Sequence, residues 1–131
     1  MIVIDASAIA SMILEENEFD NLSEFLKIEP ISIDLLIKEA TSAILKAYKR
    51  KRINENDLNF KYEALNNLKK LIKFYSQDEI LPDAFQLSKN ENISIYDALY
   101  ISLAKLKKAS ILSIDKKLRE TANKLNIKTF P

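Results

Sequence analysis

Short, fully apolar runs alternate with longer amphipathic stretches along the chain. The runs at residues 1–4 and 109–114 are rich in β-branched side chains and predict buried strands. Residues 31–33, after Pro30, predict a third strand, and brief strands are expected near residues 79–81 and in the final IKTF. Strands that alternate with helical stretches in this way predict a parallel sheet with helices on both faces.

The amphipathic stretches predict helices with recognisable ends. Asp34 and Ser94 are suitable N-caps, and Pro82 suits the first turn of a helix. Two long helices, which meet near residues 54–56, should pair as a hairpin. The predicted helices cover residues 6–14, 18–27, 35–51, 57–75, 82–90, 96–108 and 116–125.

Composition narrows the class of protein. A chain of 131 residues with 47% hydrophobic and 30% charged side chains fits a single globular domain over residues 1–131. No apolar segment reaches the length of a membrane helix, and the start lacks the basic region of a signal peptide, so a soluble, cytoplasmic protein is expected. With a net charge of only +1, any surface for nucleic acid must come from local clustering of basic residues.

Missing residue types exclude several catalytic mechanisms. The chain contains no His and no Cys, which excludes a Ser-His-Asp triad, a histidine base, a thiol nucleophile and a histidine or thiolate zinc site. It contains no Gly, so a Walker loop and a GxGxxG turn are excluded as well. Chemistry must then come from carboxylates, hydroxyls or basic side chains, and carboxylates suit Mg²⁺ or Mn²⁺ better than zinc.

Two aspartates occupy equivalent places in the predicted sheet. Asp5 follows residues 1–4 and Asp115 follows residues 109–114, each at the carboxyl end of a buried strand and just before a helix. Ligands of open α/β sheets bind outside the carboxyl ends of the strands, so the two carboxylates converge if their strands are neighbours. Aspartate is also a preferred N-cap, and capping explains either residue taken alone.

Asp97 and Glu39 lie inside predicted helices. The helix of Asp97 is apolar on nearly every side, so its carboxylate is expected to be buried, where it needs a partner, a proton or a metal. The alternative is a capping box with Ser94, which accounts for the residue type without any function. Glu39 borders an apolar arc of small residues, and an ordinary solvated glutamate explains it when it is considered alone.

Considered together, the four acids indicate a metal site. Like charges about 4 Å apart repel by about 4 kcal/mol at an effective dielectric of about 20, so converging carboxylates need a cation or protonation. Without histidine or cysteine, a divalent metal is the simplest partner. Metals held between carboxylates activate water and neutralise charge during phosphodiester cleavage, which makes a nuclease the leading hypothesis.

Four segments resemble the PIN-domain family, and in particular its VapC-type toxins. They are IVIDASAI at the start, KEATSAILKA in the first long helix, ISIYDALYISLA late in the chain and ILSIDKKL near the end. The resemblance covers essentially the whole chain. It implies an α/β fold, a PIN-like three-layer α/β/α sandwich with a short central parallel sheet and a long helical hairpin, which agrees with the predicted alternation.

The resemblance also implies an activity and a set of roles. The implied activity is a Mg²⁺- or Mn²⁺-dependent endoribonuclease that acts on RNA. Its metal would be held, directly or through water, by Asp5, Glu39, Asp97 and Asp115. Ser7 and Ser113 would orient carboxylates or waters around them. Such toxins commonly form a homodimer and are neutralised by a small VapB-type antitoxin that inserts into the active-site groove.

Basic and aromatic residues near these motifs have two explanations each. The cations around Lys46, at the end of the first long helix, could contact RNA phosphates, but they also complement the helix dipole. Lys46 is kept as a candidate RNA contact because it lies two turns beyond Glu39 on a similar face. Tyr96 and Tyr100 could stack on a base, although core packing is the simpler explanation.

Three other functions stay open at this point. A housekeeping PIN nuclease of RNA processing would share the chemistry, but such proteins often carry extra domains. A non-catalytic binding module with a vestigial acidic pocket would keep the acids without the reaction. A receiver-like phospho-switch fits least well, because its usual paired acids near the first strand are missing: Asp5 is followed by Ala6.

Overall fold

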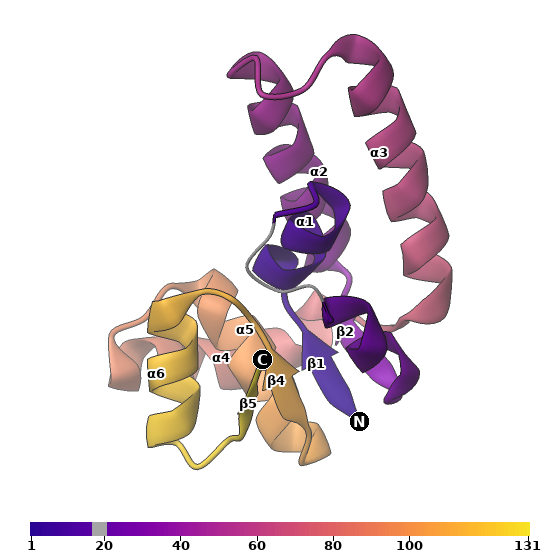
Figure 1. Cartoon of the computed structure of the whole chain (residues 1–131). Coiled ribbons are helices and arrows are strands. Elements are labelled where there is room, and N and C mark those ends of the chain that lie inside the picture. Colours follow the sequence, from indigo (N-terminus) through magenta and orange to yellow (C-terminus); the bar gives the residue numbers. More distant parts are fainter. Residues whose placement is uncertain (17–20) are drawn as a thin grey trace.

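A fully parallel sheet of five strands forms the middle of the molecule (Figure 1). The computed structural model describes residues 1–16 and 21–131 of the chain. The strands are ordered β3-β2-β1-β4-β5, which makes β1 the central strand. Their bounds are β1 (Ile2–Ile4), β2 (Pro30–Ile33), β3 (Lys73–Tyr75), β4 (Ser110–Leu112) and β5 (Thr129–Phe130).

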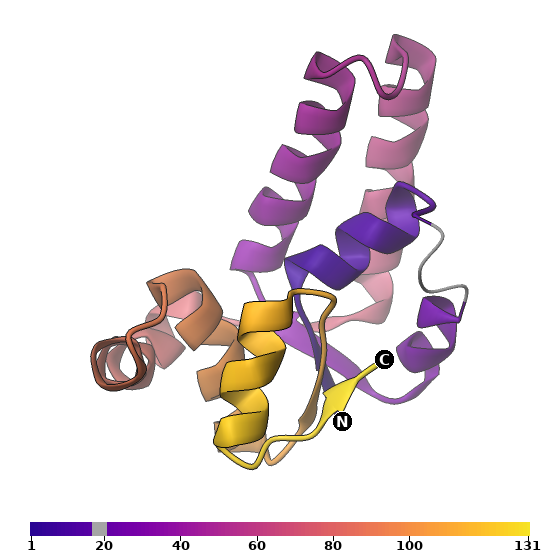
Figure 2. The ribbon, with the colours of Figure 1, turned by 60° about the vertical axis from the view of Figure 1, so that its left-hand side comes forward.

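Helices cover both faces of this sheet (Figures 1 and 2). One face carries α1 (Ala6–Ile13), α2 (Leu35–Lys49) and α3 (Glu55–Leu68). The other carries α4 (Gln77–Glu91), α5 (Ile95–Lys107) and α6 (Lys116–Lys124). The short 3-10 helices are η1 (Leu22–Lys27) and η2 (Lys69–Leu71). The predicted α/β/α sandwich is therefore confirmed.

The alternation of side chains along β1 divides the core into two parts. Ile2 and Ile4 pack against α1, α2 and α3, whereas Val3 packs on the side of α4, α5 and α6. All three are at most 1% exposed, which explains why this strand is apolar at every position. The α2–α3 hairpin extends well beyond the sheet, with the two helices side by side (Figure 2).

The strand expected at residues 31–33 is present as β2, but the brief strand expected near residues 79–81 is not where the sequence predicted it. Residues 73–75 form β3, whereas the expected strand near 79–81 lies inside α4, and the helix predicted to reach Tyr75 ends at Leu68. β3 is an edge strand of three residues, which is too short to show the alternation of apolar and polar residues that identifies a strand. Its exposed Lys73 is the kind of charged residue that keeps an edge strand from pairing with another chain.

Two helix starts also differ from the predictions. α4 begins before Pro82 because Ser76 caps it, with Ser76 Oγ accepting the Asp78 N–H at 3.2 Å. Asp34 does not cap α2 with its side chain; its Oδ1 instead accepts the Gln77 N–H at 3.1 Å at the start of α4.

The amphipathic stretch predicted as a helix over residues 18–27 is only partly described. Residues 22–27 form the 3-10 helix η1, not an α-helix, and residues 18–20 lie outside the described part of the chain. Side chains of η1 lie against the α1–α3 side of the core, where Phe25 contacts Phe130 with 5.2 Å between ring centroids. Phe25 and Leu26 thus face the core as an amphipathic stretch would, although the helix is of the 3-10 type.

Candidate active site

The buried centre of the candidate site is Asp5, which follows β1 and begins α1. Asp5 is only 3% exposed. Its Oδ1 accepts the Ala8 N–H at 2.9 Å and the Ser7 hydroxyl at 2.7 Å, while its Oδ2 accepts the hydroxyl of Ser113. The bond from Ala8 is the expected N-cap. The two serine hydroxyls add hydrogen bonds that capping alone does not require.

The two serines connect the carboxyl ends of β1 and β4. Ser7 Oγ lies 3.3 Å from Ser113 Oγ and accepts the Ile114 N–H at 3.1 Å. Ser113, which is fully buried, also accepts the Asp115 N–H at 3.0 Å. This network follows from the pairing of β1 with β4, in which Ile4 is in register with Leu112. Both serines thus contact the carboxylate that they were expected to orient.

Asp115 occupies the corresponding place after β4. It is exposed, and its Oδ1 accepts the Leu118 N–H at 3.0 Å, so it is the N-cap of α6. β1 and β4 are neighbours, which meets the condition under which the two carboxylates were expected to converge, and the two strand-end acids lie on the same edge of the sheet.

Glu39 and Tyr100 join the two helical layers. Tyr100 on α5 is 2% exposed, and its hydroxyl donates a hydrogen bond of 2.7 Å to Oε1 of Glu39 on α2. Burial and the adjacent Glu39 raise the pKa of Tyr100 above its usual value, which keeps this hydroxyl a donor. Core packing of Tyr100 was expected from the sequence, but its bond to Glu39 was missed. The sequence could have suggested such a bond, because the hydroxyl of a buried tyrosine needs a hydrogen-bond partner.

Asp97 is half-buried, not buried as the apolar character of its helix predicted. It lies in the first turn of α5, before the helix enters the core at Ala98. Ser94 Oγ accepts the Asp97 N–H at 3.1 Å, which is one half of a capping box. The returning bond to the carboxylate is formed at Asn54 and Asp57 in α3 but not here, so Ser94 does not account for the Asp97 side chain.

Burial makes Asp5 an unusual acid. Burial raises its pKa to about 6, although the hydrogen bonds from Ser113, Ala8 and Ser7 act in the opposite direction. The negative charge of Asp115 raises the pKa further, as expected for two carboxylates at the same edge of the sheet.

The helix-borne acids are linked to the same group. Burial raises the pKa of Glu39, the Tyr100 hydroxyl lowers it, and the charge of Asp97 raises it. Burial and then the charge of Asp115 raise the pKa of Asp97, against a lowering by Lys117. Electrostatic repulsion therefore connects the acids in the order Glu39, Asp97, Asp115, Asp5. We refer to these four residues as the acidic site.

The acidic site has no preformed metal cage in the part of the chain that the structure describes. Within residues 1–16 and 21–131, no three acidic side chains converge closely enough to form a ready group of metal ligands. The donors are all carboxylate oxygens, which Mg²⁺ and Mn²⁺ prefer, and Mg²⁺ is commonly held by one or two carboxylates together with waters and substrate phosphates. The residues present therefore fit such an ion, for which waters would have to supply the remaining ligands.

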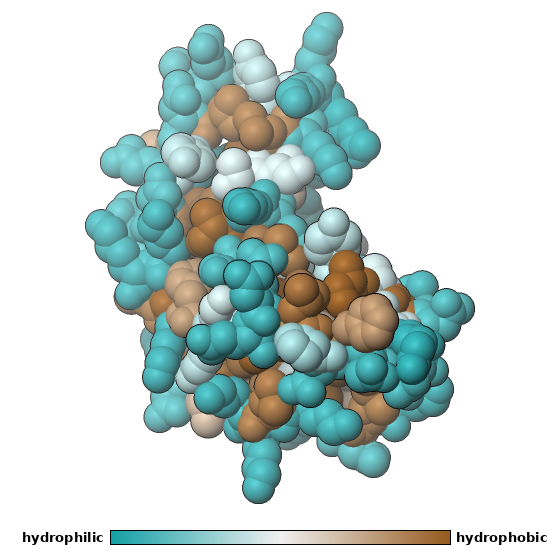
Figure 3. All heavy atoms as spheres, turned by 180° about the vertical axis from the view of Figure 1, so that it is seen from behind, coloured by the Kyte–Doolittle hydropathy of each residue, from teal (hydrophilic) through white to brown (hydrophobic). Residues whose placement is uncertain are grey.

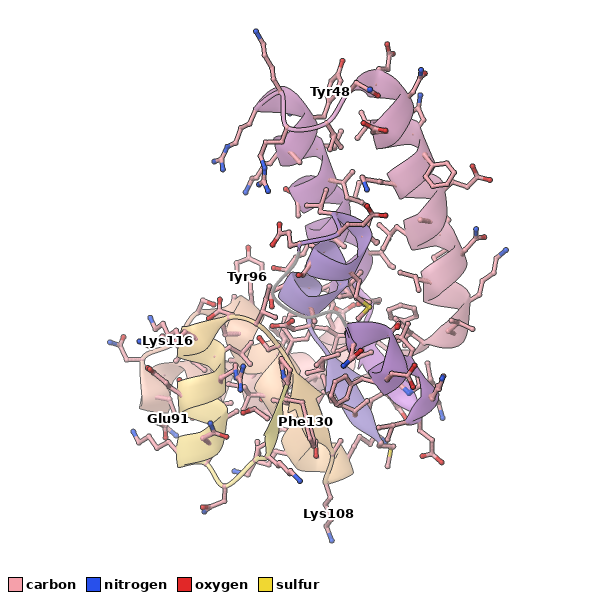
Figure 4. All side chains as sticks on the ribbon, viewed as in Figure 1. Tyr48, Glu91, Tyr96, Lys108, Lys116 and Phe130 are labelled. Carbon is pink, nitrogen blue, oxygen red and sulfur yellow. The ribbon has the colours of Figure 1, made fainter. Side chains whose placement is uncertain are left out.

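The remaining candidates lie on the surface around this site. Lys46 is exposed on α2. Tyr96 is 54% exposed at the start of α5, so core packing was the wrong explanation for it, and its ring projects away from the helix (Figure 4). A ring in this position, next to Asp97, is available to stack on a base.

The fold and the motifs agree with one known family. The model of the PIN-domain family matches residues 2–124. The chain belongs to the PIN-domain family, and to its VapC type. Over 121 residues it is 30% identical to "Ribonuclease VapC3" of Pyrobaculum aerophilum, a match that covers 91% of this chain and 92% of that protein.

Solved structures share the fold at low sequence identity. PAE2754 from Pyrobaculum aerophilum matches with a TM-score of 0.72 and 19% identity, over 98% of this chain and 82% of that one. A toxin-antitoxin complex from Klebsiella pneumoniae matches with a TM-score of 0.63 and 8% identity, over 91% and 90% of the two chains. In the described part of the chain, no helix is long and apolar enough to span a membrane.

Proposed function

We propose that this chain is a Mg²⁺- or Mn²⁺-dependent endoribonuclease and the toxin of a toxin–antitoxin pair. Membership of the PIN-domain family and similarity to a protein named as a ribonuclease support the nuclease activity. The observation that carries the proposal is Asp5, a buried carboxylate whose pKa is raised to about 6 and which two serine hydroxyls hold in place. Acids kept in such costly environments are concentrated in functional sites.

The acidic site would hold the cation, directly or through water, with Asp5, Glu39, Asp97 and Asp115. When bound, the cation supplies a more acidic water and neutralises charge that develops on the phosphate. The repulsion that raises the pKa of Asp5, Glu39 and Asp97 supports this assignment, because a positive charge among them would relieve it.

The hydroxyls around the acids would position them. Ser7 and Ser113 fix the two oxygens of Asp5, and both are already committed to that carboxylate. The chain has no histidine that could activate a serine, so neither is expected to act as a nucleophile. Lys46 would contact a phosphate of the RNA, which its exposure on α2 permits.

The proposed partners are a small VapB-type antitoxin and a second copy of this chain. A toxin-antitoxin complex among the structures of the same fold supports the first. The second is supported by apolar side chains on α4 and α5: Leu81, Phe85 and Leu106 are 43%, 60% and 51% exposed. Apolar side chains gather over this region (Figure 3, lower right).

Light scattering tests the proposed dimer. The wild type should have the mass of a dimer, and Phe85→Glu should reduce this mass towards that of a monomer. A monomeric wild type would contradict the proposal.

RNA cleavage tests the nuclease directly. Labelled RNA incubated with the protein should be cut with Mg²⁺ or Mn²⁺ and left intact with EDTA. Asp97→Asn should lower the rate by about 10²-fold or more, because it removes one acid of the metal site. Asp83→Asn, the same change at an exposed position of α4, is the matched control and should cut normally. Cleavage that survives Asp97→Asn, or that needs no metal, would contradict the assignment.

Thermal melting separates the enzyme from a non-catalytic binding module. Mn²⁺ at about tenfold its dissociation constant should stabilise the wild type by about 1.4 kcal/mol and the Asp97→Asn variant by clearly less. Stabilisation without cleavage of any RNA would instead identify a binding module. The absence of both effects would reject the metal site.

A further inference from the structure

A groove leads away from the acidic site between α1 and α2. It encloses about 280 Å³. Ser7 and Ile114 line it where it meets the acidic site, and these are the residues whose hydroxyl and N–H form the network around Asp5. The groove is therefore continuous with the proposed catalytic centre.

The charged residues along the groove are mostly basic. Among its lining residues in the described part of the chain, Lys46, Arg50 and Arg52 are the cations and Glu16 is the only acid. Glu16 is already paired with Arg52, with 3.6 Å between Oε1 and Nη2. The groove thus presents net positive charge, which complements a polyanion.

The spacing of the cations suits a chain of phosphates. Lys46 and Arg50 are one helical turn apart on α2, which is about 6 Å along the axis. This distance is comparable to the separation of neighbouring phosphates in an extended single strand. Beside them on α2 the groove is lined by the small side chains Ala43 and Ala47, which let a strand approach the helix closely.

Other cations at the end of α2 do not face this groove. Lys49 and Lys51 line a different hollow, between the end of α2 and the start of α3. Within the basic run at residues 46–52, Lys46 and Arg50 line the groove and Lys49 and Lys51 do not, whereas Arg52 borders both hollows. This division provides a control with equal charge.

We propose that the groove between α1 and α2 carries the backbone of single-stranded RNA to the acidic site, with Lys46 and Arg50 contacting successive phosphates and Arg52 the far end. The inference rests on the proposed function and specifies how its substrate is held. A groove of about 280 Å³ has room for one backbone and not for the full width of a duplex, which favours a single strand. Glu16 restrains Arg52 until a phosphate competes for it.

Equilibrium binding tests the groove. The Asp97→Asn variant, which should bind without cutting, is titrated into a fluorescent single-stranded RNA of about 12 nucleotides at several KCl concentrations. Adding Lys46→Gln and Arg50→Gln together should weaken binding by about tenfold and reduce the slope of log K against log salt by about 1.4, or about 0.7 for each phosphate contact. Adding Lys49→Gln and Lys51→Gln instead removes the same charge and should change the slope by less than half as much.

Two further binding measurements use a variant that should strengthen binding and an RNA that should bind less well. Glu16→Gln should tighten binding about twofold, because Arg52 is released and a negative charge is removed from the groove. A duplex of the same sequence should bind more weakly than the single strand. Its binding should be weakened equally by the Lys46/Arg50 pair of substitutions and by the Lys49/Lys51 pair. Equal effects of the two pairs, or preferred binding of the duplex, would overturn the proposal.

Kinetics distinguish failure of the groove from failure of the proposed function. In the otherwise wild-type protein, the groove pair should raise KM for RNA and leave kcat nearly unchanged, since these contacts bind substrate and transition state alike. If the wild type cuts RNA and the two pairs have equal KM, only the groove is wrong. If the wild type neither cuts nor binds RNA, the proposed function itself is wrong.

Discussion

The acidic site has two unlike halves. Asp5 and Asp115 come from the ends of neighbouring strands, and both are held by backbone N–H groups at helix starts. Glu39 and Asp97 come from helices on opposite faces of the sheet, and Tyr100 is the side chain that fixes Glu39. The strand half is fixed by the sheet itself, whereas the helix half depends on how two layers meet. We therefore expect changes at the strand half to have larger consequences.

Asp5→Asn should give the largest change in stability. The pKa of Asp5 is about 6 in the folded protein against 3.8 for the ordinary group, so folding favours its protonated form. Ionisation of Asp5 therefore lowers the free energy of unfolding. This loss is absent below about pH 4, grows as the pH rises to about 6, and reaches its full value of about 3 kcal/mol above that. Asparagine carries no charge, so Asp5→Asn should raise the metal-free free energy of unfolding by up to this amount near pH 7.

Urea denaturation in EDTA at several pH values measures this difference. Wild type and Asp5→Asn should have nearly equal free energies of unfolding near pH 3.5 and should diverge between about pH 4 and pH 6. The comparison cancels the titration of groups that do not interact with Asp5. A difference that does not change with pH would show that Asp5 is not an acid of raised pKa.

Ser113→Ala should have the next largest effect. It removes a hydroxyl that lowers the pKa of Asp5 and leaves a buried oxygen without that donor. The expected cost is about 2 kcal/mol near pH 7, and the pH range over which stability falls should extend further upward, with its lower end still near the ordinary pKa of aspartate. In an Asp5→Asn background the same substitution should cost less, which a double-mutant cycle by urea denaturation would show.

Tyr100→Phe is the matched deletion in the helix half and should have the smallest effect. It removes the hydroxyl that lowers the pKa of the half-buried Glu39, so that pKa should rise. We expect a loss of about 1 kcal/mol in stability and a kcat reduced about fivefold with little change in KM. In a Glu39→Gln background the effect on kcat should disappear. A stability loss larger than that of Ser113→Ala would invert the comparison between the halves.

The strand half could be predicted from the sequence because its signals are local. The apolar runs that end at Asp5 and Asp115 identify the strands, and their position before helices identifies the edge of the sheet. The burial of Asp5 was not anticipated, because it depends on contacts with a distant part of the chain, such as Ser113 directly after β4.

The helix half was harder to predict because its contacts are between distant elements. The apolar pattern around Asp97 describes the whole helix, but exposure of its first turn is set by what packs against that turn. The pairing of Tyr100 with Glu39 joins residues 61 positions apart, and no spacing rule relates them. For the same reason β3 was misplaced: a three-residue edge strand is defined by its neighbour β2, not by its own pattern.

The pairing of β1 with β4 also has a consequence for how activity appears as the chain folds. The hydrogen bond from Ser113 to Asp5 closes a loop of 108 residues, and bringing the ends of such a loop together costs about 4 kcal/mol of chain entropy. Contacts of this length form late and slowly. A chain that has already formed its helical hairpin would still lack the oriented Asp5, so during refolding RNA cleavage should lag behind helix formation.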